Sequence, residues 1–163
     1  MKIAKADIHL KAKYRRPRRA AAFSLAEVAA TSFLFVILGI FSANICLLIF
    51  GCSVNDKACR DVVRAAAQQS TAAKALQFAQ ASVNNHKTDG HFISPITLVG
   101  GTVNYNDYGG NPPAGQTPYV QATTRVTVNL PAPLFFFGAG FTNQMNFSQT
   151  YTSPIIRTKY LLP

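Results

Sequence analysis

Acidic side chains are scarce in this chain, which has 6 Asp and Glu against 16 Lys and Arg in 163 residues. Only four acids follow residue 52: Asp56, Asp61, Asp89 and Asp107. General acid–base catalysis and calcium binding both need carboxylates that converge, and nothing in the sequence resembles a phosphate-binding loop, a nucleophile elbow or a catalytic triad. We therefore expect no enzyme, no small-molecule substrate, no cofactor and no metal site.

Cysteines are also few. Cys46, Cys52 and Cys59 form no CxxC pair, so the sequence has no metal-type cysteine spacing. On a continuous helix, Cys52 and Cys59 would lie about 10.5 Å apart along the axis, which is too far for a disulfide. An intrachain bridge therefore needs a helix break near residues 51–53, and the alternatives are free or intermolecular thiols.

Histidines flank one of the acids, as His86 and His91 stand on either side of Asp89. Two imidazoles with no third imidazole or thiol nearby make a poor metal site. We interpret this segment as a solvated turn.

Positive charge, in contrast, is abundant and concentrated. The net charge is +10, and residues 1–19 alone carry +7. Such a run can bind nucleic acid, or it can hold one end of a membrane helix in the cytoplasm. Because the run directly precedes a long apolar segment, the positive-inside rule favours the second interpretation. We expect no nucleic-acid partner, a cytoplasmic leader at 1–22, and a C-terminal part on the opposite side of the membrane.

The apolar segment is Phe23–Gly51, and its dense part, Phe33–Phe50, is interrupted only by Ser42 and Asn44. About 20 helical residues cross the ~30 Å hydrocarbon layer of a bilayer. The sequence therefore predicts a single transmembrane helix at 23–52.

The next segment predicts a second, amphipathic stretch of helix at 53–88. It is rich in Ala and Gln, and residues 56–85 contain neither Gly nor Pro. Apolar or small residues recur at steps of three and four, which predicts one narrow stripe for packing on a sheet or on another helix. The stripe consists of Val62, Ala65, Gln69, Ala72, Leu76, Ala79 and Val83.

Residues 89–163 change to Gly, Pro, Asn, Thr and aromatics, which predicts a β-rich part. Strict alternation identifies the clearest strand, 119–130. We also expect strands at 144–152, at 93–105 with a break at Gly100–Gly101, and at an edge at 155–161, with a loop at 106–118. The prolines and phenylalanines of 131–140 predict a loop whose aromatics pack on the domain or form a contact patch for a partner or the membrane surface. The fold class is α+β, with the long N-terminal helix packed on a small antiparallel sheet.

Glu27 is the one acid within the apolar segment, where an ionised carboxylate is costly. The residues around it, Ala22-Phe23-Ser24-Leu25-Ala26-Glu27, resemble the processing site of type IV prepilins, although alanine stands where glycine dominates in that family. The resemblance implies cleavage at Ala22/Phe23 by a prepilin peptidase. It also implies that Glu27 meets the new α-amino group of a neighbouring subunit during assembly.

The chain is more specifically similar to the TadE/TadG-like pseudopilins of tight-adherence pilus systems. The similar features are the arginine-rich leader, the single span, the Ala/Arg helix at 58–68 and the Leu130-Pro131 step. This resemblance implies a pilin-like fold and a minor pseudopilin for assembly of an adhesive pilus. The expected location is the bacterial inner membrane as a single-pass protein, with other pilin or pseudopilin subunits as partners.

A second resemblance lies at the far end of the span. Ile49-Phe50-Gly51-Cys52 is similar to a lipoprotein cleavage site, in which Cys52 is acylated and becomes the mature N-terminus. The apolar run before it is longer than the ~7–15 residues of a usual signal core. The alternative to a pseudopilin is thus a lipoprotein, or an uncleaved membrane-anchored binding domain.

Overall fold

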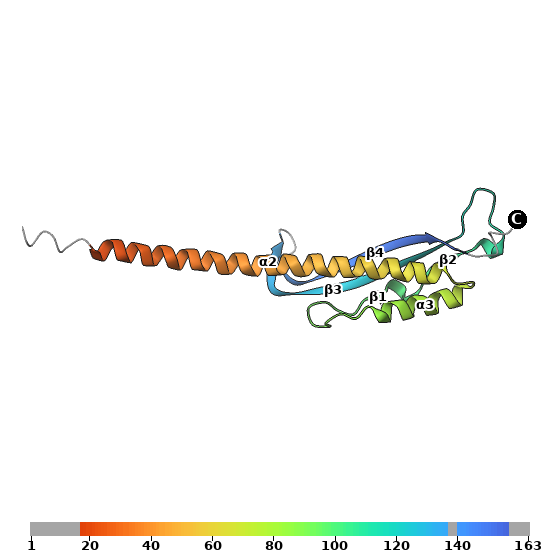
Figure 1. The fold of residues 1–163 in the computed structure, drawn as a ribbon, viewed down its shortest axis with the longest axis horizontal. Helices are drawn as coiled ribbons and strands as arrows, with labels where there is room; N and C mark the ends of the chain where they lie inside the picture. The colour runs from red at the N-terminus through yellow and green to blue at the C-terminus, as the bar shows by residue number, and fades with distance from the viewer. Residues whose placement is uncertain (1–16, 137–139, 157–163) are drawn as a thin grey trace, which may run out of the picture. The chain divides into compact units, whose positions relative to one another are not determined.

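The computed structural model describes residues 17–136 and 140–156, with side chains described for 24–133 and 142–156. The chain divides into two compact units, Met1–Ser42 and Ala43–Pro163. The layout is α+β, as predicted, with a long N-terminal helix and a small antiparallel sheet (Figure 1). The elements are α2 (Pro17–Ala67), α3 (Ala72–Asn85), β1 (Thr97–Leu98), η1 (Val99–Gly101), β2 (Asn104–Asn106), η2 (Tyr108–Gly110), β3 (Tyr119–Phe136) and β4 (Gly140–Pro154).

Strand β3 is the centre of the sheet. It pairs antiparallel with β1 (Leu98 opposite Thr124), with β2 and with β4 (Ala122 opposite Tyr151). Every second residue of β3 from Val120 to Leu130 is buried, as the alternation predicts, because successive side chains of a strand point to opposite faces. The buried residues are Val120, Ala122, Thr124, Val126, Val128 and Leu130.

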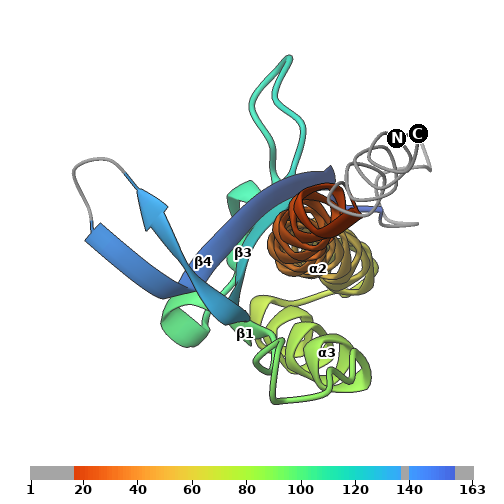
Figure 2. The same cartoon turned by 90° about the vertical axis from the view of Figure 1, so that its left-hand side faces the viewer.

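Helix α3 and the part of α2 in the second unit lie on the same side of β3 and β4 (Figure 2). The part of α2 in the second unit buries small residues spaced three and four apart, a spacing that places them on one helix face. That face consists of Ala58, Cys59, Val62, Val63 and Ala66. Small side chains allow the helix backbone to approach the sheet closely, and the hydrophobic core forms between them.

The prediction of one helix over 53–88 is wrong. The chain leaves the helix after Ala67 and begins α3 at Ala72, where the Thr71 hydroxyl accepts a hydrogen bond from the Lys74 N–H. Helix α3 buries Ala75, Ala79 and Val83, whereas Ala72 is exposed.

The break needs neither Gly nor Pro, because residues 68–71 are Gln, Gln, Ser and Thr and bring nothing apolar to the core. Turning the chain there lets α3 add its small face to the core that α2 already covers.

The strands also differ from the predicted ones at their ends. β3 extends through Phe136, so part of the expected 131–140 loop is strand, with a shift in register between Asn129 and Leu134. The predicted 93–105 strand is reduced to β1 and β2 around a turn in which Gly100 has a φ of 71°, and Ile93 makes an isolated bridge to Val128. Strand β4 ends at Pro154. Of the predicted edge strand, Ile155 and Ile156 lie outside any strand, and the rest falls outside the described residues.

Candidate functional site

The residues of the predicted processing and assembly site all lie in the first turns of α2. Ala22 and Phe23 are helical, and their side chains are outside the described set. Glu27 is exposed, and its backbone carbonyl accepts a hydrogen bond of 2.8 Å from the Thr31 hydroxyl. The structure thus places Glu27 on the outside of a regular helix.

Polar groups gather on one face of this part of α2. Ser24, Glu27 and Thr31 are three and four residues apart, so they line up along the helix. Around them the surface is apolar, with Leu25 76%, Phe33 68% and Phe35 69% exposed. Among the side chains that the structure describes, Glu27 has no cationic partner. Such a face, with one carboxylate and two hydroxyls in apolar surroundings, is suited to contact with another helix in a membrane.

Helix α2 is long and apolar enough from Ser24 onward to cross a membrane. Length and composition are the properties that make this possible, and a signal sequence near an N-terminus shares them. Residues 24–43 are exposed throughout, in contrast to the C-terminal part of α2 on the sheet.

A buried polar contact joins α2 to the sheet in the second unit. Asn55 and Thr124 are both fully buried, and the Thr124 hydroxyl donates a hydrogen bond of 2.8 Å to the Asn55 side-chain carbonyl. The Asn55 amide donates to the backbone carbonyl of Phe147 at 3.3 Å. One side chain of α2 thereby binds both β3 and β4, and its hydrogen bonds offset the cost of burying an amide.

Cys59 makes a similar contact one turn further along α2. Its buried thiol lies 3.2 Å from the carbonyl oxygen of Gln149 and 3.5 Å from that of Ala122. All three cysteines are free, and α2 is continuous through residues 51–53. The intrachain Cys52–Cys59 bridge that a helix break would have allowed is therefore absent.

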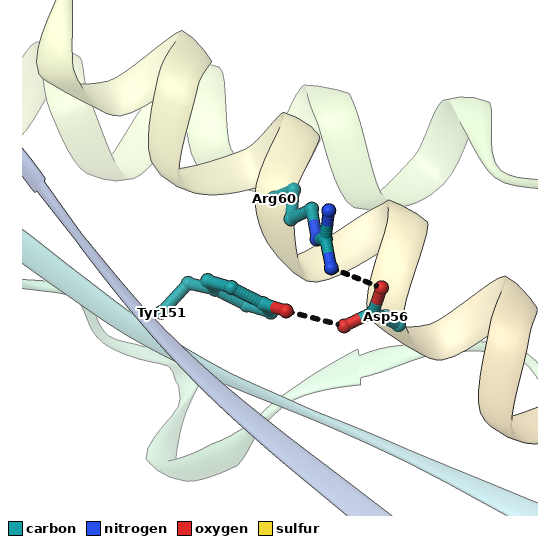
Figure 3. Close-up of polar contacts among 3 residues, drawn as sticks. All are labelled: Asp56, Arg60 and Tyr151. Atoms are coloured by element: carbon teal, nitrogen blue, oxygen red, sulfur yellow. Dashed lines mark hydrogen bonds and ion pairs between the residues drawn. The ribbon is translucent and has the colours of Figure 1, made fainter.

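An ion pair on α2 completes the contact with β4 (Figure 3). The Tyr151 hydroxyl donates a hydrogen bond of 2.6 Å to Asp56, and the Arg60 guanidinium lies 2.9 Å from the other oxygen of that carboxylate. Arg60 also lies over the Tyr151 ring, 5.0 Å from its centroid. The Tyr151 hydroxyl and the Asp56 carboxylate raise the pKa of Arg60. This group fixes the side of α2 that faces β4.

Gly51 is required by packing. It is buried, and a Cβ atom added to it would collide with a methyl group of Val128 on β3. A side chain at this position would require either Val128 to shift or the helix and strand to move apart. The glycine that makes residues 49–52 resemble a lipoprotein site thus has a structural reason to be there.

The two histidines near Asp89 have different partners. His86 Nε2 lies 3.2 Å from an Asp61 oxygen, while the His91 ring meets Phe92 edge to face at 4.7 Å. Asp89 accepts backbone N–H groups from Ile93 at 2.8 Å and Phe92 at 3.1 Å, and these lower the pKa of its carboxyl group. No group of three or more potential metal-binding side chains occurs among the described residues.

Sequence reasoning missed most of these contacts between α2 and the sheet. Thr124 was a visible signal, since it is the one hydroxyl on the otherwise apolar face of β3. In the sequence, Asn44 only interrupts the apolar run. Its buried amide donates to the Ala132 carbonyl at 3.1 Å. The partners of Asn44, Asn55 and Cys59 lie on β3 or β4, far away in sequence, so the spacing gives no indication of them.

Comparison with known proteins gave no relative. No protein-family model matches the chain, and neither a curated protein nor a solved structure matches it.

Proposed function

We propose that this protein is a non-enzymatic, single-span membrane protein of the minor pseudopilin type, which assembles with other subunits through the apolar start of α2. The observation that supports this most is the exposed apolar face at residues 24–43, with Glu27 as its only acid. Apolar surface of this extent is typical of a membrane or subunit interface. The same helix continues onto an antiparallel sheet, an arrangement compatible with a pilin-like fold.

The role proposed for Glu27 follows from electrostatics. Cleavage at Ala22/Phe23 would create an α-amino group, whose usual pKa is about 7.7–8.0, so it is largely protonated at neutral pH. Attraction between unit charges 4 Å apart is about 1 kcal/mol in water and about 4 kcal/mol at an effective dielectric constant of 20. An amine from a neighbouring subunit would therefore compensate Glu27 more strongly in a helix bundle than in water.

Processing requires a local change in the leader. The bond between Ala22 and Phe23 lies inside α2, which begins at Pro17. A peptidase must reach the carbonyl group of the bond that it cleaves. In a helix, that carbonyl accepts a hydrogen bond from the N–H group four residues further along. We propose that the first turns of α2 unwind in the peptidase.

Two measurements test the proposal. N-terminal sequencing of the protein from bacterial membranes should give a chain that begins at Phe23. A zero-length carbodiimide, which joins a carboxylate only to an amine in contact with it, should then link Glu27 to the α-amino group of a neighbouring subunit. Glu27→Gln should abolish this product, and the control Ser32→Ala, in the next turn of α2, should retain it. An unchanged product in Glu27→Gln would refute the pairing.

The alternative is a lipoprotein or an uncleaved membrane-anchored binding domain, and the Ile49–Cys52 motif is the observation that favours the lipoprotein. A mature chain beginning at Cys52 would show it, and a chain that retains Met1 would indicate the uncleaved anchor. Cleavage before Cys52 would also remove Asn44 and its hydrogen bond to Ala132. The lipoprotein should therefore lose part of the contact between α2 and β3.

A further inference from the structure

A pocket on the second unit lies between α2 and the C-terminal end of β4. Its volume is about 250 Å³, and its lining combines two arginines and one valine from α2 with three hydroxyl-bearing residues from β4. The lining residues are Arg60, Val63, Arg64, Tyr151, Thr152 and Ser153. Guanidinium and hydroxyl groups can all donate hydrogen bonds, and none of these side chains is acidic. The lining therefore suits an anionic ligand.

Arg60 is held in position before any ligand binds. Its guanidinium lies 2.9 Å from an Asp56 oxygen and over the ring of Tyr151, 5.0 Å from the ring centroid (Figure 3). The ion pair uses Nη2, so N–H donors on the other nitrogens remain for a ligand. Because the side chain is already ordered, binding costs less conformational entropy than it would at a mobile arginine.

Arg64 supplies the net charge of the pocket. The charges of Asp56 and Arg60 compensate each other, and the Tyr151 hydroxyl donates to the second oxygen of that carboxylate. Arg64 lies one turn further along the same helix face, is exposed, and makes no ion pair with any acid that the structure describes. One uncompensated positive charge matches a carboxylate better than a phosphate group, which carries about −1.5 to −2 charges at pH 7.

The second unit itself offers no carboxylate for this pocket. By sequence, residues 43–163 contain eight Lys and Arg against four Asp, a net charge of +4. Besides Asp56, Asp61 lies 3.2 Å from a histidine nitrogen, Asp89 accepts two backbone N–H groups and Asp107 accepts one. A second copy of this unit would bring the same engaged acids and the same excess of positive charge. The complementary carboxylate therefore belongs to a different protein.

We propose that this pocket binds the carboxylate of an aspartate or glutamate side chain on an acidic partner protein. The carboxylate accepts N–H groups of Arg60 and Arg64, while hydroxyl groups of β4 supply further donors. Captured chain ends are typically bound by backbone N–H groups, whereas the donors here are side chains, and this favours an acidic side chain over a chain end. The inference does not rest on the proposed function, since the pocket belongs wholly to the second unit.

Chemical modification of arginine tests the proposal on the full-length protein in non-ionic detergent at low salt. Phenylglyoxal modifies exposed arginines, and mass spectrometry of the digested protein reports each site. A peptide with one glutamate and blocked ends should slow modification of Arg64 several-fold, while Arg125, exposed on the sheet, should react at an unchanged rate. The same peptide with glutamine should slow neither. No slowing at Arg64 would overturn the proposal, and so would equal slowing at both arginines, because charge screening alone would then explain it.

One variant and two further probes sharpen the result. Arg64→Gln changes an exposed side chain that has no described ion-pair partner, so the fold should be retained. The concentration of glutamate peptide that half-protects Arg60 should then rise about tenfold, as the loss of a charge-assisted hydrogen bond predicts. Lys74→Gln, which removes an exposed positive charge on α3, is the matched control and should leave that concentration unchanged. Stronger protection by inorganic phosphate, or protection only by a glutamate-free peptide with a free C-terminus, would overturn the assignment to an acidic side chain.

Discussion

At the scale of single residues, the structure depends on polar side chains at buried positions, where apolar side chains are usual. Asn55 and Thr124 are fully buried and hydrogen-bonded to each other across the contact between α2 and β3. A satisfied buried pair contributes little net stability, but an orphaned member costs about 1–3 kcal/mol. Such a pair also restricts the register in which a helix can lie on a strand, because only one register satisfies both groups.

The first prediction follows from that asymmetry. Thr124→Val keeps the shape of the side chain but leaves the Asn55 carbonyl oxygen without its donor, so the free energy of unfolding should fall by about 1–3 kcal/mol. The control is Thr123→Val on the exposed face of β3, where the hydroxyl contacts Thr150 and water can replace it. Denaturant unfolding of the full chain in detergent, followed by circular dichroism, measures both. Equal losses in the two variants would show that burial of the pair is irrelevant.

At the scale of elements, the break between α2 and α3 shows how packing overrides helix propensity. The sequence through residues 68–71 could continue a helix, yet the chain turns and α3 buries Ala75, Ala79 and Val83 in the core shared with α2. Positions along α3 differ in consequence: Ala72, at its start, is exposed, whereas Ala79, in its middle, is fully buried.

The second prediction uses this difference. Ala79→Lys would place an unpaired charge and a longer side chain in the core, and should lower the free energy of unfolding by about 3–5 kcal/mol, as removal of the partner of a buried charge does. Ala72→Lys, the matched control on the same helix, should change it by less than about 0.5 kcal/mol. Thermal unfolding of the two variants compares them directly. A similar melting temperature for both would contradict the placement of α3.

At the scale of the whole molecule, charge and apolar surface are segregated along the chain. Residues 1–19 carry +7 of the net charge of +10, and the apolar part of α2 follows directly. Basic residues beside a span are retained in the cytoplasm, while acidic residues contribute little to orientation. The orientation of the protein should therefore depend on the leader and hardly at all on charges of the second unit.

The third prediction concerns that orientation. Replacing Arg15, Arg16, Arg18 and Arg19 by Gln should lower the fraction of molecules whose second unit lies outside the cytoplasm. Trypsin added to spheroplasts measures this fraction by cleavage after the exposed Lys87. Replacing Lys57 and Arg64, both exposed on α2, by Gln is the control and should leave the fraction unchanged. If the leader variant kept the wild-type fraction, another feature would set the topology.

The sequence by itself determined the elements whose signals are local. The long apolar run predicts the long helix. The alternation of apolar and polar residues predicts the buried face of β3, because the period of the apolar residues indicates which face of an element is covered. The candidate role of Glu27 likewise rests on its neighbours in the chain, and the structure adds that it lies exposed beside Ser24 and Thr31.

Only the tertiary structure decided the features that join distant segments. The partners of Asn44, Asn55 and Cys59 are residues of β3 or β4 more than 60 positions away. The close contact at Gly51 is likewise with Val128 of β3. The end of α2 at Ala67 depends on the core that α2 and α3 share with the sheet. The extension of β3 to Phe136 is of the same kind, since a strand next to two prolines is maintained by its pairing with β4 and not by its own propensity. Local patterns fix which face of an element is buried, and packing decides where the element ends and what it meets.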